Sequence, residues 1–431
     1  MTNPLLIRNG RIIDPAQDLD QTAPLFVADG KIAAIGGEAE RLGKAAGVRV
    51  IDAAGQIVAP GLIDMHVHLR VPGGERAETI ASGTAAAVAG GFTAVACMPN
   101  TRPALDNDSM IRAVLYAAER EGACRVYPIG ALTKGREGKE LAEMRLMKHA
   151  GAVAFSDDGD GIQDAGVCLK ALQYCQSIDA LFVQHCEDRG LAAGGCMNGG
   201  DVAVRLGLPG LSRLAEDVMV ERDVRLAHAA GARYHMCHIS TAGAVEIIRA
   251  AKDAGISATT EVCPHHLLLT DDDCAGYDTN FKMNPPLRTR ADVEACIEGV
   301  RDGTIDCLIT DHAPHPAELK ALPFQDAPMG IIGLETALGL FCKALIDPGV
   351  LSWPQLIRAM STRPAELLGI PGGSLRTGVA ADLTLIDPSR EWTIDRNQSR
   401  SLSRNTPFHG WKVRGKATMT IVGGEVRFSD A

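Results

Sequence analysis

Short apolar runs, each followed by a stretch with helical spacing of its apolar residues, recur through the middle of this 431-residue chain. Eight such runs occur: "IVAPGLIDMHV", "GFTAVACMPN", "CRVYPIGALT", "GAVAFSDD", "ALFVQHCE", "RYHMCHIS", "ISATTEVCPHH" and "IDCLITDHAPH". Continuous apolar strands are typical of a parallel sheet that is buried on both faces. Eight strands alternating with helices predict an α/β fold, the (β/α)8 TIM barrel.

The two ends of the chain have a different pattern, with short strands separated by turn residues. The first part contains "PLLIRNGRIID" and "APLFVADGKIAAIG", and the last part contains "ADLTLIDP" and "GKATMTIVGGEVRF". Neither end is long enough for a core of its own, so we expect the two to pair. The sequence therefore predicts a small discontinuous β domain from residues 1–56 and 374–431, and a barrel from residues 57–373.

Composition narrows the function classes. Hydrophobic residues make up 46% and charged residues 22%, and the formal net charge is -10. The basic residues are scattered, which argues against nucleic acid, and no apolar stretch approaches the ~18 residues of a membrane span. We expect a cytoplasmic protein with a small-molecule substrate.

The twelve cysteines are spread along the chain and mostly lie within apolar runs. Without a secretory signal they indicate buried free thiols rather than disulfides. Cys186 and Cys237 each adjoin a histidine at a strand end, and strand alternation is expected to turn both sulfurs to the opposite face.

Polar residues of metal-binding type follow the predicted strands where each one ends. They are His66 and His68 after the first run, Asp157 and Asp158 after the fourth, His185 after the fifth, His238 after the sixth and Asp311 after the eighth. Barrel active sites lie at the carboxyl ends of the strands, so these side chains are expected to meet at one rim. A buried structural role is the alternative for any one histidine, but five strand ends carrying such residues by chance is a poor explanation of the whole set.

Imidazole and carboxylate groups are ordinary ligands of Zn²⁺ and similar divalent ions. We expect one or two ions, with two favoured. His66, His68 and Asp311 are assigned to one ion and His185 and His238 to the other, with Asp158 and a water between them. Such a water loses its proton near neutral pH.

Asp311, in "LITDHAPH", is the candidate general base and acid. A carboxylate beside a metal-bound hydroxide can accept its proton during attack on a carbonyl and pass it to the departing nitrogen.

Several ordered motifs together resemble one known family. They are "PGLIDMHVHLR", "CMPNTRP", "FSDDG", "QHCED", "CHIST", "PHHLLLT", "FKMNPPLR" and "TDHAPH". In these motifs the chain is similar to the dihydroorotases of the longer bacterial type (class I), cyclic amidohydrolases of the amidohydrolase superfamily. The resemblance covers residues from about 55 to 370, and the two chain ends look like the family's small β domain.

The resemblance implies an activity and a set of substrate contacts. The activity is the reversible cyclisation of N-carbamoyl-L-aspartate to L-dihydroorotate in pyrimidine biosynthesis. The implied substrate residues are His68, Arg70, Asn100, Asn284, His315, Met329 and Gly330. The planar fork of Arg70 suits a carboxylate.

The fourth run also bears on the type of metal bridge. Hydantoinases, allantoinases and other dihydroorotases commonly use a carboxylated lysine there, whereas this run has no lysine after Lys148. Asp158 matches the family position, and Asp157 is expected to make a structural hydrogen bond. Val71 departs from the family's usual glutamate but removes no ligand.

Three questions stay open at this point. A hydantoinase or allantoinase is the rival enzyme, and a weakly active partner of aspartate transcarbamoylase is the rival of another class. Association with that enzyme and self-association are compatible with activity. The segment 315–335 is either a moving lid or an ordered connection.

Overall fold

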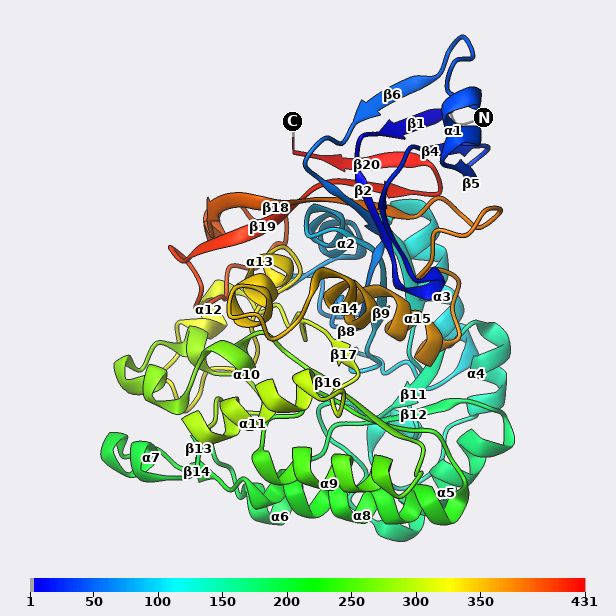
Figure 1. The fold of residues 1–431 in the computed structure, drawn as a ribbon. Helices are drawn as coiled ribbons and strands as arrows, with labels where there is room; N and C mark the ends of the chain where they lie inside the picture. The colour runs from blue at the N-terminus through cyan, green and yellow to red at the C-terminus, as the bar shows by residue number, and fades with distance from the viewer. Residues whose placement is uncertain (1–3, 431) are drawn as a thin grey trace.

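A computed structural model describes residues 4–430, and the chain is an α/β protein (Figure 1). Eight parallel strands lie near the centre of the molecule, in two sheets of order β10-β9-β8 and β11-β12-β15-β16-β17. They are β8 (Leu62–Val67), β9 (Phe92–Cys97), β10 (Arg125–Pro128), β11 (Ala154–Ser156), β12 (Leu181–Gln184), β15 (Tyr234–Met236), β16 (Ala258–Val262) and β17 (Cys307–Leu308).

Single parallel bridges join the two sheets at both of their outer edges. Gly130, just after β10, pairs with Phe155 of β11, and Val67 of β8 pairs with His312, beyond β17. One buried apolar cluster also draws on every one of these strands or on the residues directly after it, with Met65, Ala96 and Val183 among its members. The strands therefore contribute side chains to a common interior cluster.

Helices alternate with these strands along the chain. They are α2 (Ile80–Ala89), α3 (Asp108–Glu121), α4 (Met144–Ala150), α5 (Ala165–Ser177), α6 (Arg189–Ala192), α7 (Asp201–Leu206), α8 (Leu214–Ala230), α9 (Ala242–Asp253), α10 (His265–Leu268), α11 (Arg290–Arg301), α12 (Ala317–Lys320), α13 (Ala337–Phe341), α14 (Trp353–Ile357) and α15 (Arg363–Leu368). A short pair, β13 (Met197–Asn198) and β14 (Gly210–Leu211), lies with α7 in the excursion after β12.

The helix starts follow from local sequence. Six helices begin after a residue whose side chain accepts a hydrogen bond from the third backbone N–H of the helix: Thr79 for α2, Asn107 for α3, Asp164 for α5, Asp188 for α6, Thr241 for α9 and Thr289 for α11. Each cap satisfies an N–H that has no partner within the helix, which typically contributes about 1 kcal/mol. The helix starts fix the lengths of the loops that follow the strands.

The two chain ends form the β-rich part at the top of Figure 1. Its strands are β1 (Leu5–Arg8), β2 (Arg11–Asp14), β3 (Leu19–Thr22), β4 (Leu25–Ala28), β5 (Lys31–Ile35), β6 (Arg49–Asp52), β7 (Ile57–Pro60), β18 (Leu383–Thr393), β19 (Lys412–Val422) and β20 (Glu425–Ser429), with helix α1 (Gly37–Leu42). One sheet has the order β5-β4-β1-β6, and the other has the order β20-β19-β18-β7-β2-β3. The second sheet combines strands from both ends of the chain.

One boundary differs from the expectation from sequence. Residues 57–60 were expected to open the first barrel strand, but as β7 they pair with β18 and β2 in the six-stranded sheet. Gly61 separates them from β8, and a Cβ added there would lie 2.0 Å from the Thr93 hydroxyl oxygen. The continuous apolar run of residues 57–67 thus contributes β7 to the six-stranded sheet and β8 to the sheet of parallel strands. The apolar content of the run does not show where one strand ends and the other begins.

All twelve cysteines are buried and unpaired, as expected. Within residues 4–430, no helix has the length and apolar character that crossing a bilayer requires.

Candidate active site

His66 lies at the centre of a buried group of imidazoles and carboxylates at the carboxyl ends of the parallel strands. Its Nδ1 hydrogen-bonds to Glu261 Oε1 at 2.6 Å. Its Nε2 lies 3.6 Å from Asp158 Oδ1 and 3.6 Å from Asp311 Oδ1. One ring nitrogen is thus fixed by the Glu261 carboxylate, and the other faces Asp158 and Asp311.

His68, two residues further along, lies beside Asp311. The His68 Nε2 is 2.9 Å from Asp311 Oδ1, and the His68 Nδ1 is 2.8 Å from Asn100 Oδ1. Because the Asn100 oxygen can only accept, it favours the tautomer with hydrogen on Nδ1. Asn100, predicted as a substrate contact, therefore also orients His68.

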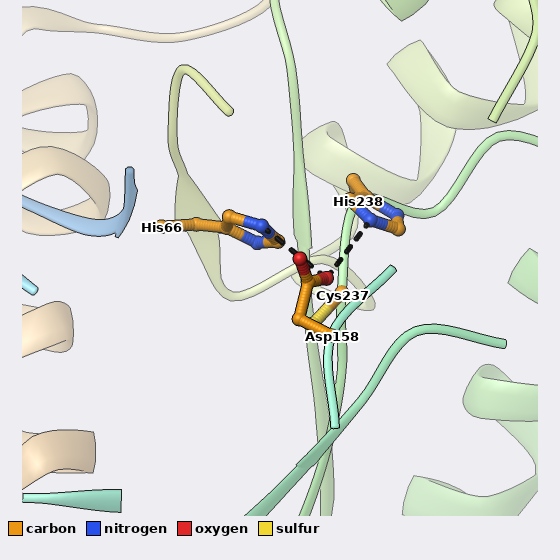
Figure 2. A group of neighbouring side chains, drawn as sticks. All are labelled: His66, Asp158, Cys237 and His238. Atoms are coloured by element: carbon orange, nitrogen blue, oxygen red, sulfur yellow. Dashed lines mark ion pairs between the residues drawn. The ribbon is translucent and has the colours of Figure 1, made fainter. Parts of the chain in front are cut away.

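The second half of the group contains Asp158, His185 and His238. Asp158 Oδ1 lies 3.9 Å from His185 Nδ1 and 3.8 Å from His238 Nε2, and these two nitrogens are 3.0 Å apart. Figure 2 shows Asp158 between His66 and His238, with its carboxylate directed at both rings. All six predicted ligands are brought together in this way.

The donor set fits a divalent cation. Ligand atoms of His66, His68 and Asp311 lie within 4.8 Å of one another, and the same is true of His66, Asp158, Cys237 and His238. Three buried atoms of the group have no hydrogen-bond partner among residues 4–430: His66 Nε2, Asp158 Oδ1 and His238 Nδ1. Buried polar atoms are rarely left without a partner, so these atoms match the lone pairs that a metal ion would take.

The electrostatics of the group favour positive charge at its centre. Burial acts to lower the pKa of His66, yet Asp158 and Glu261 together raise it well above its ordinary value. Burial likewise acts to raise the pKa values of Asp158 and Asp311, but the surrounding histidines hold both below the ordinary value. Both carboxylates are therefore ionised at neutral pH.

Two candidate ligands and Arg70 have backbone conformations that L-residues rarely adopt. The φ angle is 29° at His238, 47° at Asp311 and 58° at Arg70. Positive φ costs a non-glycine residue roughly 1 to 3 kcal/mol, and such strain clusters at functional sites. At these strand ends, side-chain direction no longer follows simple alternation.

The expectation for Cys237 was wrong for this reason. Its sulfur was expected to face away from His238, but it lies in the same buried group as His66, Asp158 and His238 (Figure 2). Strand β15 ends at Met236, so the alternation of an extended strand does not continue through Cys237. The Cys186 sulfur, in contrast, contacts the Tyr234 hydroxyl at 3.1 Å, in the layer between strands and helices.

The two adjacent aspartates after β11 have different partners. Asp157 Oδ1 accepts hydrogen bonds from the backbone N–H groups of Leu132 and Thr133, at 2.9 and 3.1 Å. Its other oxygen accepts from the Thr133 hydroxyl. The expectation that Asp157 makes structural hydrogen bonds is confirmed, and Asp158 is the residue that faces the histidines.

A cavity of about 290 Å³ opens over this group. Its lining includes every predicted substrate residue: His68, Arg70, Asn100, Asn284, His315, Met329 and Gly330. Pockets for small ligands usually measure about 300 to 1,000 Å³, so this one suits a small ligand.

The cavity wall carries a cationic side chain, a histidine and an amide. Arg70 Nε donates to Pro314 O at 3.2 Å, and its guanidinium lies 3.4 Å from His315 Nε2. Burial, followed by the charge of Arg70, lowers the pKa of His315 to about 3, so this imidazole is neutral. Asn284 donates to Glu187 at 2.9 Å, and its own Oδ1 is buried without a hydrogen-bond partner in the described chain.

Glu261 is a site residue that the sequence did not indicate. It is 1% exposed on strand β16 and also lies 3.2 Å from His235 Nε2. The one available signal was a charged residue inside the apolar run "ATTEV", since an unpaired buried glutamate is rare. His265 and His266, two further histidines near the rim, lie with Cys263 in a separate buried group.

Comparisons with known proteins identify relatives of this chain. The profile of the dihydro-orotase-like family matches residues 55–244. A curated relative from Pelotomaculum thermopropionicum, named dihydroorotase, is 50% identical over 426 residues, which cover 99% of each chain. Another of that name from Trichlorobacter lovleyi is 49% identical over 425 residues, again 99% of each chain.

Solved structures of cyclic amidohydrolases are similar in fold. An L-hydantoinase from Arthrobacter aurescens superposes with a TM-score of 0.88 at 28% identity, covering 99% of this chain and 96% of the other. A D-hydantoinase from Thermus sp. gives 0.85 at 26% identity, covering 99% and 95%. With relatives near 50% identity over almost their full length, the chain belongs to the dihydroorotase family.

Proposed function

We propose that this chain is a dihydroorotase, which interconverts N-carbamoyl-L-aspartate and L-dihydroorotate in pyrimidine biosynthesis. The observation that carries the substrate assignment is Arg70. Its guanidinium lines the cavity, and no carboxylate within residues 4–430 forms an ion pair with it. A half-buried cation that lines the cavity without a carboxylate partner favours an anionic substrate, whereas hydantoin and allantoin carry no carboxylate.

We assign the metal ligands as His66, His68, Asp158, His185, His238 and Asp311, which would hold one or two Zn²⁺ ions, with two favoured. When bound, such ions lower the pKa of water and polarise a carbonyl oxygen. His66 is oriented by Glu261 and His68 by Asn100, so each presents Nε2 to the centre of the group. Ligands held in this way need little rearrangement on binding.

Asp311 moves the proton. In hydrolysis its carboxylate accepts a proton from the attacking water and delivers it to the ring nitrogen as the amide C–N bond breaks. In cyclisation the same proton travels back, and water leaves. The neighbouring imidazoles of His68 and His66 hold the pKa of Asp311 below its ordinary value, so Asp311 is ionised before the step, as a base must be.

Arg70, with Asn100 and His315, holds the substrate carboxylate. The Asn284 amide and the backbone at Met329 and Gly330 contact the ring. The free Asn284 Oδ1 can accept from a ring N–H. Two fixed ends of the substrate place the ring carbonyl over the metal ligands, and this positioning makes up a large part of the catalysis.

A substrate comparison tests the proposal. Metal-replete protein is assayed with L-dihydroorotate, hydantoin and allantoin, and turnover of dihydroorotate alone is expected. The variant Arg70→Met should raise KM for dihydroorotate by about a hundredfold, because a bidentate charged contact contributes roughly 3 kcal/mol. Turnover of hydantoin or allantoin without dihydroorotate would overturn the assignment.

Asp311→Asn tests the proton step separately. The amide keeps the shape of the side chain but cannot act as a base, so kcat should fall by about 10² to 10⁴. Metal content, measured by mass spectrometry, should stay above half of the wild-type value because the other five ligands remain. Near-normal turnover in this variant would remove Asp311 from its role.

The remaining features are proposals on the same footing. The parallel bridges at both sheet edges and the shared interior cluster support a closed (β/α)8 barrel. The pairing of β7 with β18 supports a small β domain whose first part ends near Gly61, with the barrel beyond it. A cytoplasmic location, self-association and association with aspartate transcarbamoylase stay predictions.

A further inference from the structure

The segment between β17 and α13 supplies one wall of the cavity. His315, Met329 and Gly330 belong to it, and all three line the cavity. The His315 Nε2 contacts Met329 O at 2.7 Å, and Ala313 N donates to Ile331 O at 2.8 Å. The two ends of the segment are thus joined directly beside the cavity.

Lys320, at the end of α12, lies behind this wall. Its side chain is 7% exposed, and its Nζ donates to three backbone carbonyls, those of Lys282 at 3.2 Å, Pro328 at 3.0 Å and Gly330 at 3.2 Å. An ammonium has three hydrogens and no acceptor, so all of its hydrogen-bonding capacity is used on backbone. Lys320, which does not itself line the cavity, therefore holds Gly330 through its carbonyl oxygen.

Lys282 reinforces the same arrangement from the segment before Asn284. Its Nζ donates to Gln325 O at 2.9 Å and to Ala327 O at 2.7 Å. Its backbone carbonyl accepts from Gly330 N at 3.0 Å. The wall segment and the segment that carries Asn284 are therefore linked as one unit.

Asn405 approaches the wall from the C-terminal part of the chain. It is 3% exposed, its Oδ1 accepts from His315 N at 3.2 Å, and its Nδ2 donates to Ala313 O and to Gly330 O, both at 3.0 Å. The side-chain amide of Asn405 thereby contacts both segments of the wall, residues 313–315 and Gly330. Gly330 O accepts from Asn405 and from Lys320 together.

We propose that Lys320 and Asn405 are positioning residues that make the cavity wall of His315 and Gly330 a preformed surface for the substrate, not a lid that opens and closes. This rests on the proposed function, because the wall is taken to contact dihydroorotate. The two residues act on binding through the backbone of Gly330 and the orientation of His315. They take no part in the proton step.

The choice between wall and lid follows from the number of buried contacts. A moving lid needs a segment whose hydrogen bonds are few or solvent-exposed. Here two buried lysines and one buried asparagine make seven hydrogen bonds as donors and one as acceptor to the backbone of this region. Breaking any of these buried hydrogen bonds leaves an unpaired polar group, which is costly.

The test uses the variants Lys320→Met and Asn405→Ala, which keep much of the packing and remove the hydrogen bonds. The matched controls are Lys44→Met and Asn397→Ala, at an exposed lysine and an exposed asparagine. Each zinc-loaded protein is measured for kcat and KM with L-dihydroorotate, for zinc content, and for amide hydrogen exchange of residues 313–335.

The expected result is a KM raised by about tenfold in both variants, with kcat changed less than about threefold and zinc content unchanged. Exchange of residues 313–335 should be slow in the wild type and faster in both variants, while the two controls match the wild type. If one variant fails to fold, the other still decides the matter.

Two outcomes would overturn the proposal. Faster exchange with unchanged KM would give Lys320 and Asn405 a structural role only, and fast exchange of residues 313–335 in the wild type would make the segment a lid. Absence of dihydroorotate turnover by the wild type is a separate result. It refutes the proposed function, while hydrogen exchange still reports on the wall.

Discussion

Glu261 offers a test of how the protein prepares a metal ligand before any ion arrives. Its Oε1 lies 2.6 Å from His66 Nδ1, and its Oε2 lies 3.2 Å from His235 Nε2. Burial acts to raise the pKa of Glu261, but His66 and His235 outweigh it and lower the pKa to about 2. The carboxylate is therefore charged, and it faces the imidazole that we assign to the metal.

The variant Glu261→Gln separates charge from hydrogen bonding. The Gln oxygen can still accept from His66 Nδ1, and its amide nitrogen can face His235 Nε2, since His235 Nδ1 has Thr259 as its partner at 2.8 Å. Only the negative charge is lost. Replacing the partner of a metal-binding histidine typically costs 10- to 100-fold in metal affinity, and we expect about tenfold, or roughly 1.4 kcal/mol, for this milder change.

Glu261→Leu should have the larger effect. It leaves His66 Nδ1–H buried without an acceptor, which adds roughly 1 to 3 kcal/mol to the loss of charge. The metal affinity should then fall by a factor of about 10² to 10³ in total.

The assay is competition between apoprotein and a chromophoric chelator for Zn²⁺. Glu78→Gln is the matched control, because Glu78 forms a buried pair with His312 at 3.1 Å and His312 is outside the assigned ligand set. Wild-type affinity in Glu261→Gln would mean that charge is irrelevant. Wild-type affinity in Glu261→Leu would refute the whole argument that Glu261 prepares His66.

Three further predictions concern the metal, the wall and pH. Removing metal with a chelator should lower the melting temperature, because an ion present at a free concentration of 100 times its Kd stabilises the fold by about 2.7 kcal/mol. A melting temperature that does not change when Zn²⁺ is added back would contradict this. Gly330→Ala should raise KM for dihydroorotate. The φ angle of Gly330 is 132°, and an added Cβ would lie 3.0 Å from His315 Nε2 and 2.8 Å from Ala313 Cβ. A wild-type KM in this variant would argue against a contact between the wall and the substrate. Burial, then the charge of Lys282, lowers the pKa of Lys320 to about 7, whereas the pKa of a lysine in the unfolded chain is about 10.5. Between these two pH values the unfolded chain binds more protons than the folded chain. The free energy of unfolding should therefore rise with pH there, by up to about 1.4 kcal/mol per pH unit. Denaturant unfolding at pH 7.5 and 9.5 should show a smaller rise in Lys320→Met than in Lys44→Met, and equal slopes would contradict the assignment.

Much of the site could be predicted because its chemistry coincides with strand ends. His66 and His68 follow an apolar run, as do Asp158, His185 and Asp311, and parallel strands bring such positions to one edge. The cysteines were predictable for a related reason, since their surroundings are apolar. Position relative to a strand end is a local property, which a single sequence displays.

Lys320 and Asn405 had no such local signal, and Glu261 had only its charge within the run of β16. Two of them have partners far along the chain: Glu261 and His66 are 195 positions apart, and Asn405 and Gly330 are 75 apart. Two of the three carbonyls that Lys320 contacts, those of Pro328 and Gly330, are only 8 and 10 positions away, but the segment must fold back before they meet its Nζ. The sequence shows a charged or polar side chain but not the carbonyl or imidazole that offsets its burial. Long-range hydrogen bonds of this kind need the fold before they can be recognised.

Cys237 shows a different limit, which is geometric. The rule that neighbouring side chains alternate holds only while the backbone is extended, and His238, with φ of 29°, ends that state one residue after Cys237. The same departure occurs at Asp311, where φ is 47°. The conformations that turn these side chains into the site are costly for L-residues, so local preference argues against them and only the surrounding contacts enforce them. The conformation of Asp311 is held by His68, whose Nε2 lies 2.9 Å from the Asp311 carboxylate. His68 is in turn oriented by its hydrogen bond to Asn100. The rule therefore fails where the chain leaves its preferred conformation, and that departure is what places the Asp311 carboxylate, which we assign as the base, among the imidazoles.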